Sequence, residues 1–326
     1  MQEIKKNIFC IRSPDNFNVL ALKIFHYQWE NNPIYREYIH QLGINPDSVN
    51  HPEAIPFLPV SFFKTHRVVT GDFKTEMTFL SSRTTGMEPS RHEVADAALY
   101  EASFMTCFER FYGKSSRYCI LALLPSYSSR QDSSLVYMVD KLITAGDHPD
   151  SGFYPDVPDA LFGMLQKAKS ACQPTILFGV TFALLDFAEN HPMDFPDLIV
   201  METGGMKGRR KELIREELHE RLIRGFGVPA IHSEYGMTEL LSQAYSQGHG
   251  RYVAPPWMRI LIRDMNDPLC LAGHDQTGGM NIIDLANLHS CSFVATQDLG
   301  KTFPDGSFEV LGRFDASDIR GCSLLV

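Results

Sequence analysis

Three short apolar runs in the middle of the chain constrain the fold more than any other feature. They are YCILALL at residues 118–124, TILFGV at 175–180 and DLIVME at 197–202. Segments with the pattern of helices separate or follow them, at 134–145, 156–170 and 181–190. Buried strands of this length that alternate with helices are typical of a layered α/β fold with a largely parallel sheet.

The segments on either side of this core have other patterns. Residues 15–31 carry apolar side chains at helical spacing, and residues 209–224 have the pattern of a strongly amphipathic helix. Residues 51–60 contain three prolines, which predict an extended connector. Beyond about residue 251, short runs between Gly, Pro and Asp turns predict β-rich structure, at 258–263, 280–284 and 292–296.

Charge and cysteine usage argue against several classes of function. The 326-residue chain has a net charge of −9 and no basic stripe, which argues against a nucleic-acid partner or an anionic membrane surface. No run reaches the ~18 apolar residues that span a bilayer, and the first residues lack the apolar core of a signal peptide. Seven scattered cysteines without a C-x-x-C pair indicate reduced, mostly buried thiols. We therefore expect a cytoplasmic protein without a membrane span.

The loop LSSRTTGMEPSRH at residues 80–92 is the first candidate site. Its hydroxyls and glycine precede two cations, Arg91 and His92. Because residues 93–112 have the composition of a helix, we expect the loop to lead into a helix N-terminus, where backbone N–H groups and the helix dipole bind anions. The alternative is a solvated turn that only caps this helix. The residues of the expected anion cradle are Ser81, Ser82, Thr84, Thr85 and Gly86.

Four further segments follow in order, and each has an ordinary alternative. ETGGMKG at 202–208 is a glycine-rich turn at the end of the third apolar run, where open α/β sheets bind ligands, but alone it is a structural strand-to-helix turn. IHSEYGMTEL at 231–240 follows a short strand and supplies an aromatic ring, a hydroxyl and two carboxylates, but alone it predicts only a helix start. TQDL at 296–299 places an acid after a strand, and GRFDASDIRG at 312–321 alone is a charged turn.

Together and in this order, these segments resemble the core motifs of the adenylate-forming superfamily, the acyl- and aryl-CoA ligases and their relatives. YGMTE at 235–239 is similar to its most specific signature. From about residue 55 onward, IPFLPVSFFKTHRV, SSRTTGMEPSRH, ETGGMKG and GRFDASDIRGCSLLV resemble a narrower group, the acyl-protein synthetase (LuxE) family, which is related to phenylacetate-CoA ligases. The resemblance implies an adenylate-forming large domain over residues 1–311, β-rich from about 251, and a C-terminal tail at 312–326 with the hinge motif and Cys322.

The same resemblance implies ATP and Mg²⁺ as cofactors and a carboxylic acid as substrate. The loop is expected to hold the β- and γ-phosphates, Glu239 to bind Mg²⁺, and Cys322 to accept the acyl group. Tyr235 is expected to stack on adenine and Asp298 to accept hydrogen bonds from the ribose. The remaining residues that match nucleotide-binding motifs are Gly204, Gly205, Gly236, Thr238 and Arg313.

Two departures from the family pattern leave three hypotheses open. Arg83 stands where the family loop has glycine, so it strains or fills the cradle, or it supplies a charge to the triphosphate. The chain also stops five residues after Gly321, without the mobile domain that is usual in the superfamily. The first hypothesis is an acyl-protein synthetase that loads a fatty acyl group onto its own cysteine and passes it to an acyl-CoA reductase-type partner. The alternatives are an acyl- or aryl-CoA ligase of the phenylacetate type, and a degenerate, non-catalytic subunit that binds acyl groups or nucleotides.

Overall fold

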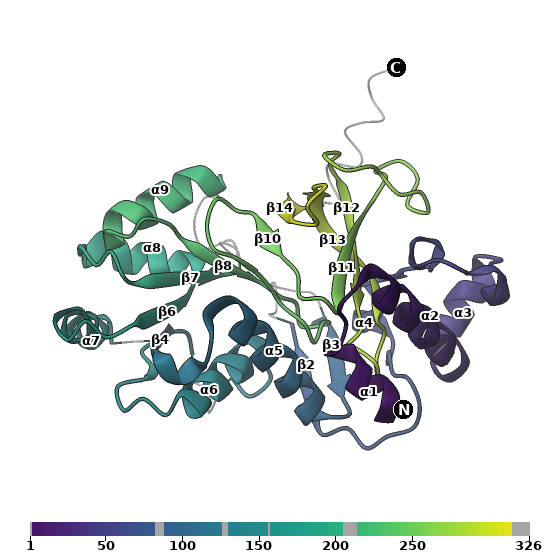
Figure 1. Cartoon of the computed structure of the whole chain (residues 1–326), viewed down its shortest axis with the longest axis horizontal. Helices are drawn as coiled ribbons and strands as arrows, with labels where there is room; N and C mark the ends of the chain where they lie inside the picture. The colour runs from purple at the N-terminus through teal and green to yellow at the C-terminus, as the bar shows by residue number, and fades with distance from the viewer. Residues whose placement is uncertain (1, 82–87, 126–129, 156, 205–213, 315–326) are drawn as a thin grey trace.

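The computed structural model of the chain describes residues 2–81, 88–125, 130–155, 157–204 and 214–314. Within these residues, one 12-stranded sheet has the order β11-β12-β13-β14-β10-β9-β8-β7-β6-β4-β5, and β1 pairs with β13. Figure 1 shows a parallel half flanked by helices on the left and an antiparallel half on the right. The expected layered α/β architecture is confirmed.

The parallel half contains the three apolar runs that were predicted to be buried strands. β4 (Cys119–Leu123), β6 (Thr175–Val180), β7 (Ile199–Thr203) and β8 (His232–Tyr235) pair in parallel, and β5 (Gly152–Phe153) pairs with β4. The helices between these strands are α6 (Ser134–Gly146), α7 (Pro158–Ser170), α8 (Thr181–Asn190) and α9 (Arg215–Phe226). Every residue of β4 is buried, as a central strand of a covered sheet requires.

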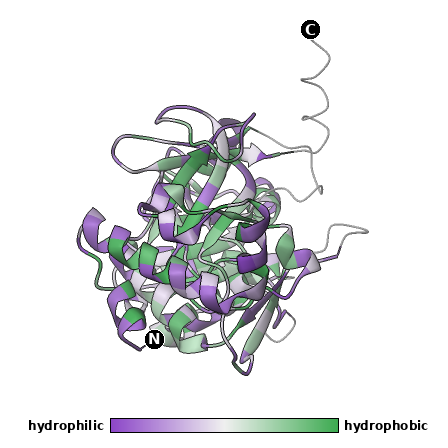
Figure 2. Ribbon diagram, turned by 90° about the vertical axis from the view of Figure 1, so that its right-hand side faces the viewer, coloured by the Kyte–Doolittle hydropathy of each residue, from purple (hydrophilic) through white to green (hydrophobic). Residues whose placement is uncertain are grey.

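Alternate residues of these strands pack into two separate hydrophobic cores. Leu121, Leu177 and Val200 belong to the core that includes the inner faces of α7, α8 and α9. Ile120 and Phe178 belong to the core that includes α6 and the long helix α5 (Ala97–Tyr112). Each such buried side chain stabilises the fold by roughly 1.5–3 kcal/mol. Figure 2 shows hydrophobic residues gathered in the interior and hydrophilic residues on the outer faces of the helices.

The antiparallel half confirms the expected β-rich region. Its long strands are β11 (Met258–Arg263), β12 (Gly278–Asp284), β13 (Phe293–Thr302) and β14 (Phe308–Arg313). The short strands β9 (Ala244–Ser246) and β10 (Tyr252–Val253) connect this half to β8, because β9 pairs with β8 and β10 pairs with β14. β8 and β13 therefore belong to one sheet, although their sequences lie about sixty residues apart.

The N-terminal helices pack against the antiparallel half. They are α1 (Gln2–Ile8), α2 (Pro14–Asn31) and α3 (Pro33–Gln41), and the short helix α4 (Phe62–Thr65) follows later. Ser13 caps α2, because its side chain accepts a hydrogen bond from the N–H of Asn16, and Pro14 takes the first helical position. The expected connector at 51–60 contains the 3-10 turn η2 (Pro52–Ala54) and β1 (Leu58–Pro59), which pairs with β13, and the 3-10 turn η1 (Pro46–Ser48) precedes it.

The helix predicted at 93–112 begins later than expected, and the loop at 80–92 is followed by a strand instead. β3 (Arg91–Val94) pairs antiparallel with β2 (Met77–Leu80), so the loop joins two strands. α5 begins only at Ala97, where the Asp96 side chain accepts a hydrogen bond from Leu99 N–H. Glu93 lies in β3 opposite Thr78 of β2, and its carboxylate accepts hydrogen bonds from Arg67 and Thr75. The loop therefore does not lead directly into a helix N-terminus, and the helix-dipole argument for it was wrong.

The structure also differs from the sequence analysis in three smaller details. No helix begins at residues 231–240: the segment forms β8 and then a turn, and the chain continues into β9. Asp298 lies inside β13 rather than after a strand.

Of the six cysteines in the described residues, Cys107, Cys119 and Cys291 are buried and the other three are exposed, so the expectation that most are buried holds for only half of them. None of the described helices is long and apolar enough to span a membrane.

Candidate active site

Residues from three strands meet where β8 ends. The Tyr235 hydroxyl, at the end of β8, donates to Asp298 Oδ2 on β13 at 2.8 Å. Arg313 lies opposite Asp298 on β14 and donates from Nε to Asp298 Oδ1 at 3.1 Å. The Asp298 side chain is 8% exposed and that of Arg313 is 69% exposed. The carboxylate is therefore held from both sides, while much of the guanidinium group faces solvent.

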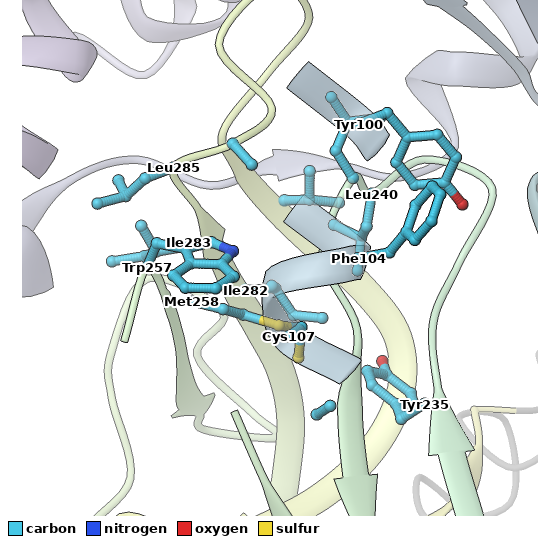
Figure 3. Close-up of a cluster of buried hydrophobic side chains, with 14 of the residues drawn as sticks. Tyr100, Phe104, Cys107, Tyr235, Leu240, Trp257, Met258, Ile282, Ile283 and Leu285 are labelled. Carbon is cyan, nitrogen blue, oxygen red and sulfur yellow. The ribbon is translucent and has the colours of Figure 1, made fainter. Parts of the chain in front are cut away.

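Tyr235 is buried among aromatic side chains. Its ring makes edge contacts with the rings of Tyr252 and Phe308, at centroid distances of 6.1 Å and 5.9 Å. Figure 3 shows it at the margin of a hydrophobic cluster that includes Phe104 and Cys107 of α5. Burial, and secondly the charge of Asp298, raise the pKa of the Tyr235 hydroxyl well above its usual value, so it stays protonated. The ring is thus fixed in place beside the charged pair Asp298–Arg313.

Glu239 lies in the turn after β8, next to both ends of the loop. Its side chain is buried, and burial raises the pKa of its carboxyl. The nearby Ser90 hydroxyl and the charge of Arg313 act in the opposite direction and lower this pKa. Ser90 in turn donates from its backbone N–H to Ser81 Oγ at 2.8 Å, and the Ser81 N–H donates to the Ser90 carbonyl at 3.0 Å. The first and last parts of the predicted phosphate loop therefore close beside Glu239.

Glycines shape the backbone on the side of β7 and β8. Gly204, directly after β7, has φ +73°, in the left-handed region that favours glycine, and its carbonyl accepts a hydrogen bond from Thr181 Oγ1. At Gly236, an added Cβ would collide with Oε1 of Glu234. Glu234 itself is buried, and burial raises the pKa of its carboxyl to about 7. A side chain at position 236 would have to displace this carboxyl group.

The structure brings together Ser81, Tyr235, Glu239, Asp298 and Arg313, and it places Gly204, Gly236 and Thr238 on the segments that carry them. The roles assigned to these residues remain predictions. The other predicted site residues lie outside the described part of the chain: Ser82, Arg83, Thr84, Thr85, Gly86, Gly205 and Cys322.

His92 was expected to add positive charge beside the loop, and the structure corrects this. Its ring is buried, and burial lowers its pKa to about 4, against hydrogen bonds with Thr238 and Asn287 that raise it. The ring is therefore neutral near pH 7. Its neighbour Arg91 forms an ion pair with Glu93, with Arg91 Nε 3.3 Å from Glu93 Oε1.

Sequence reasoning missed several residues that hold this site together. Ser90 lies in the loop at residues 80–92 but is not among the predicted phosphate-binding residues. A serine in a sequence carries no signal that its hydroxyl lies near Glu239. Asn287 and Asp284 lie almost fifty residues beyond Glu239, in a segment without any motif. Only the folded chain shows that they contact the turn that carries Glu239.

The side chains of the site are better suited to bind Mg²⁺ together with a nucleotide than to hold a metal ion by themselves. The described residues contain no group of three or more His, Cys, Asp or Glu side chains that can hold a metal ion. Glu239 is a single buried carboxylate, and Mg²⁺ is commonly held by one or two carboxylates together with phosphate oxygens and water. The exposed part of Arg313 is a further group that can reach an anionic ligand.

Comparison with known proteins shows the fold. No protein-family model and no curated protein sequence matches the chain. A 2-hydroxyisobutyryl-CoA ligase structure with 2-HIB-AMP and CoA matches with TM-score 0.70 and 14% identity, over 94% of this chain and 70% of that chain. ATP-bound MatB from Rhodopseudomonas palustris matches with TM-score 0.55 and 17% identity, over 72% of this chain and 47% of MatB. The luciferase-like enzyme of the mealworm Zophobas morio matches with TM-score 0.53 and 15% identity, over 76% of this chain and 60% of that enzyme.

These neighbours are adenylate-forming enzymes, and the chain has their fold. At these identities the likeness concerns the fold alone. The aligned part of the chain spans about half the length of MatB and about seven-tenths of the 2-hydroxyisobutyryl-CoA ligase.

Proposed function

We propose that the protein activates a carboxylic acid with ATP and Mg²⁺ to form an acyl-adenylate. One observation carries the proposal: the ends of the Ser/Thr/Gly loop close beside Glu239, next to the Tyr235–Asp298–Arg313 group. The matched structure of MatB contains ATP, and that of the 2-hydroxyisobutyryl-CoA ligase contains 2-HIB-AMP. Fold and side-chain positions support the same chemistry.

Each residue has a distinct part in this reaction. The carboxylate of the acid attacks the α-phosphorus, and the bond between that phosphorus and the pyrophosphate oxygen breaks. This step needs in-line positioning and neutralisation of negative charge, and no protein nucleophile. Bound Mg²⁺ supplies part of that neutralisation. Glu239 offers the carboxylate oxygen for the ion, the loop at 81–86 offers donors to the phosphates, and Arg313 offers a cation that Asp298 holds in place.

The acceptor of the acyl group forms the finer part of the proposal. We propose that Cys322 takes the acyl group from the adenylate and that an acyl-CoA reductase-type protein then receives it, as the resemblance of the terminal segment implies. A second candidate is an acid–CoA ligase. It is favoured by the structural match to the 2-hydroxyisobutyryl-CoA ligase, which was solved with CoA bound.

Acid-dependent exchange of labelled pyrophosphate into ATP tests the central step. We expect exchange with at least one member of a panel of fatty, aryl and hydroxy acids, and none without acid. A parallel reaction with CoA, analysed for acyl-CoA, separates the two candidate acceptors. Binding of Mg·ATP by calorimetry without exchange for any acid would contradict adenylation and support the non-catalytic nucleotide-binding hypothesis.

A further inference from the structure

The turn that carries Thr238 and Glu239 is held by side chains from distant parts of the chain. It belongs to no helix or strand. Asn287, in the segment between β12 and β13, donates from Nδ2 to the Glu239 carbonyl at 2.8 Å and to the Cys291 carbonyl at 2.9 Å. Both partners are carbonyl oxygens, which only accept, so this orientation of the Asn287 amide is the one that satisfies them.

His92 holds the residue before Glu239. Its Nδ1 lies 2.7 Å from the Thr238 carbonyl, and its Nε2 lies 3.0 Å from Asn287 Oδ1. Both neighbours are oxygens that only accept, and the neutral ring has a single N–H, which belongs at Nδ1, the shorter of the two contacts; Nε2 then faces Asn287 Oδ1 without a proton. The edge of the ring packs against Phe63, at 5.8 Å between centroids and 90° between planes. The imidazole is thus wedged between α4 and the turn.

Asn287 is itself fixed in place. Gln28 of α2 donates from Nε2 to the Asn287 carbonyl at 3.0 Å, to the Leu288 carbonyl at 3.1 Å and to Ser292 Oγ at 3.1 Å. On the other side of Glu239, the buried carboxylate of Asp284 accepts from the N–H groups of Leu241 and Ser242 at 2.8 Å and 2.9 Å. The backbone is therefore held both before and after Glu239.

The residue just before β3 also lies beside the carboxylate. Ser90 lies two residues before His92, its hydroxyl acts on the Glu239 carboxyl and lowers its pKa, and its backbone closes the loop through Ser81. The Ser90–His92 segment consequently contacts the carboxylate of Glu239, the carbonyl of Thr238 and the predicted phosphate loop. A shift of Thr238 relative to this segment would change the distance between Glu239 and the loop.

We propose that His92 is a positioning residue: its Nδ1–H bond to the Thr238 carbonyl, together with the Asn287 Nδ2 bond to the Glu239 carbonyl, sets the place of the Glu239 carboxylate relative to the Ser81–Ser90 loop ends. This inference rests on the proposed function and names a determinant of its Mg·ATP use. Groups that orient metal ligands in this way commonly change metal affinity or activity by about 10- to 100-fold when they are removed.

Two substitutions at one position separate positioning from packing. The amide nitrogen of His92→Asn takes the place of Nδ1 and keeps the donor to Thr238, whereas that of His92→Gln takes the place of Nε2 and loses it. We expect His92→Asn to keep acid-dependent exchange within about threefold of wild type. We expect the rate of acid-dependent exchange to fall at least about tenfold in His92→Gln, and this variant to need more Mg²⁺ for its half-maximal rate. Asn287→Ser, which lacks the amide donor to the Glu239 carbonyl, should behave like His92→Gln.

The control is His191→Gln. His191 stacks on Phe187 and contacts Asp159 in the helical layer, so its loss lowers stability without touching the turn. If exchange in all variants falls only in step with their melting temperatures, at an unchanged Mg²⁺ requirement, His92 is structural and the inference is overturned. The inference is also overturned if the exchange rate of His92→Asn falls as much as that of His92→Gln.

Wild-type protein without exchange for any acid would count against the proposed function, not against the positioning role. In that case Mg·ATP binding by calorimetry decides on the same variants. Weaker binding by His92→Gln and Asn287→Ser than by His92→Asn supports the role, and equal affinities overturn it.

Discussion

Glu239 is the residue on which the proposed chemistry depends most directly. Glu239→Gln keeps the size and the contact with Ser90 but removes the charge that attracts Mg²⁺. We expect acid-dependent pyrophosphate exchange to fall at least about tenfold, a barrier increase of ~1.4 kcal/mol. The thermal unfolding midpoint should not fall, because a buried carboxyl with a raised pKa loses little when it is made neutral. Exchange at the wild-type rate would exclude Glu239 as the metal ligand.

His92 gives the stability of the protein a definite dependence on pH. Its pKa is lowered by burial to about 4 in the folded chain, from an unperturbed 6.5. As the pH falls below 6.5, the unfolded chain takes up this proton first. The stabilising contribution of the neutral ring is therefore complete above pH 6.5 and is lost as the pH falls to about 4, by a few kcal/mol.

Urea unfolding of wild type and His92→Asn between pH 7.5 and ~4.5 measures this effect. Comparison with the variant matters because Glu234, with a pKa raised to about 7, acts in the opposite direction: the stability it contributes is lost as the pH rises through 7. We expect wild type to lose stability relative to His92→Asn as the pH falls. Imidazole resonances that place the His92 pKa above 6.5 would show that its two oxygen neighbours outweigh burial.

At the scale of elements, the sequence predicts best what local pattern determines. β4, β6 and β7 were foreseen because each is a continuous apolar run that must be buried on both faces. β3 was not, because its short polar sequence RHEV pairs with β2 through contacts that no local pattern displays. The site shows the same division. The YGMTE signature located Glu239, but the link from His92 to Asn287 joins residues 195 positions apart and leaves no local trace.

The loop between β2 and β3 carries a prediction of its own. Arg83 stands where the resembled family has glycine, and it lies outside the described residues. A non-glycine residue at a position that needs a left-handed conformation costs about 1–2 kcal/mol, and an arginine side chain there would also occupy the predicted cradle. We therefore expect Arg83→Gly to tighten Mg·ATP binding and raise exchange.

Isothermal titration with Mg·ATP measures the change at this position. Lys64→Gly, on the separate short helix α4, serves as a control for the removal of a long cation near the same end of the chain. Weaker binding by Arg83→Gly would instead identify the arginine as a phosphate ligand. Unchanged binding would mean that the side chain points away from the nucleotide.

At the scale of the whole molecule, the candidate site lies where the two halves of the sheet meet. Tyr235 ends a strand of the parallel half, and its partner Asp298 lies on β13 of the antiparallel half. His92 and Gln28 tie the same region to α4 and to the N-terminal helices. Both halves of the sheet therefore have to be in place for the site to form, and destabilising substitutions in either half should lower activity together with stability.

The last prediction concerns the path of the acyl group out of this site. In the proposed reaction the Cys322 thiolate attacks the carbonyl carbon of the acyl-adenylate, a thioester bond forms, and AMP leaves with the electron pair of the broken bond. Arg320 lies two residues earlier in the sequence, and a cation beside the thiol would favour the thiolate. Cys322→Ser should consequently still form adenylate and release pyrophosphate, but it should lose the hydroxylamine-sensitive acyl label on the protein. A labelled carboxylic acid with ATP and Mg²⁺ provides the measurement.

Cys270→Ser is the matched control, because Cys270 is also exposed but lies beside Asp267, whose hydrogen bond and charge raise the pKa of its thiol. A thiol with a raised pKa forms less of the attacking thiolate, so this variant should keep the label. Two results would overturn the assignment. Label that persists in Cys322→Ser would place the acceptor on another residue. Wild-type protein that stays unlabelled but converts added CoA to acyl-CoA would identify the protein as an acid–CoA ligase.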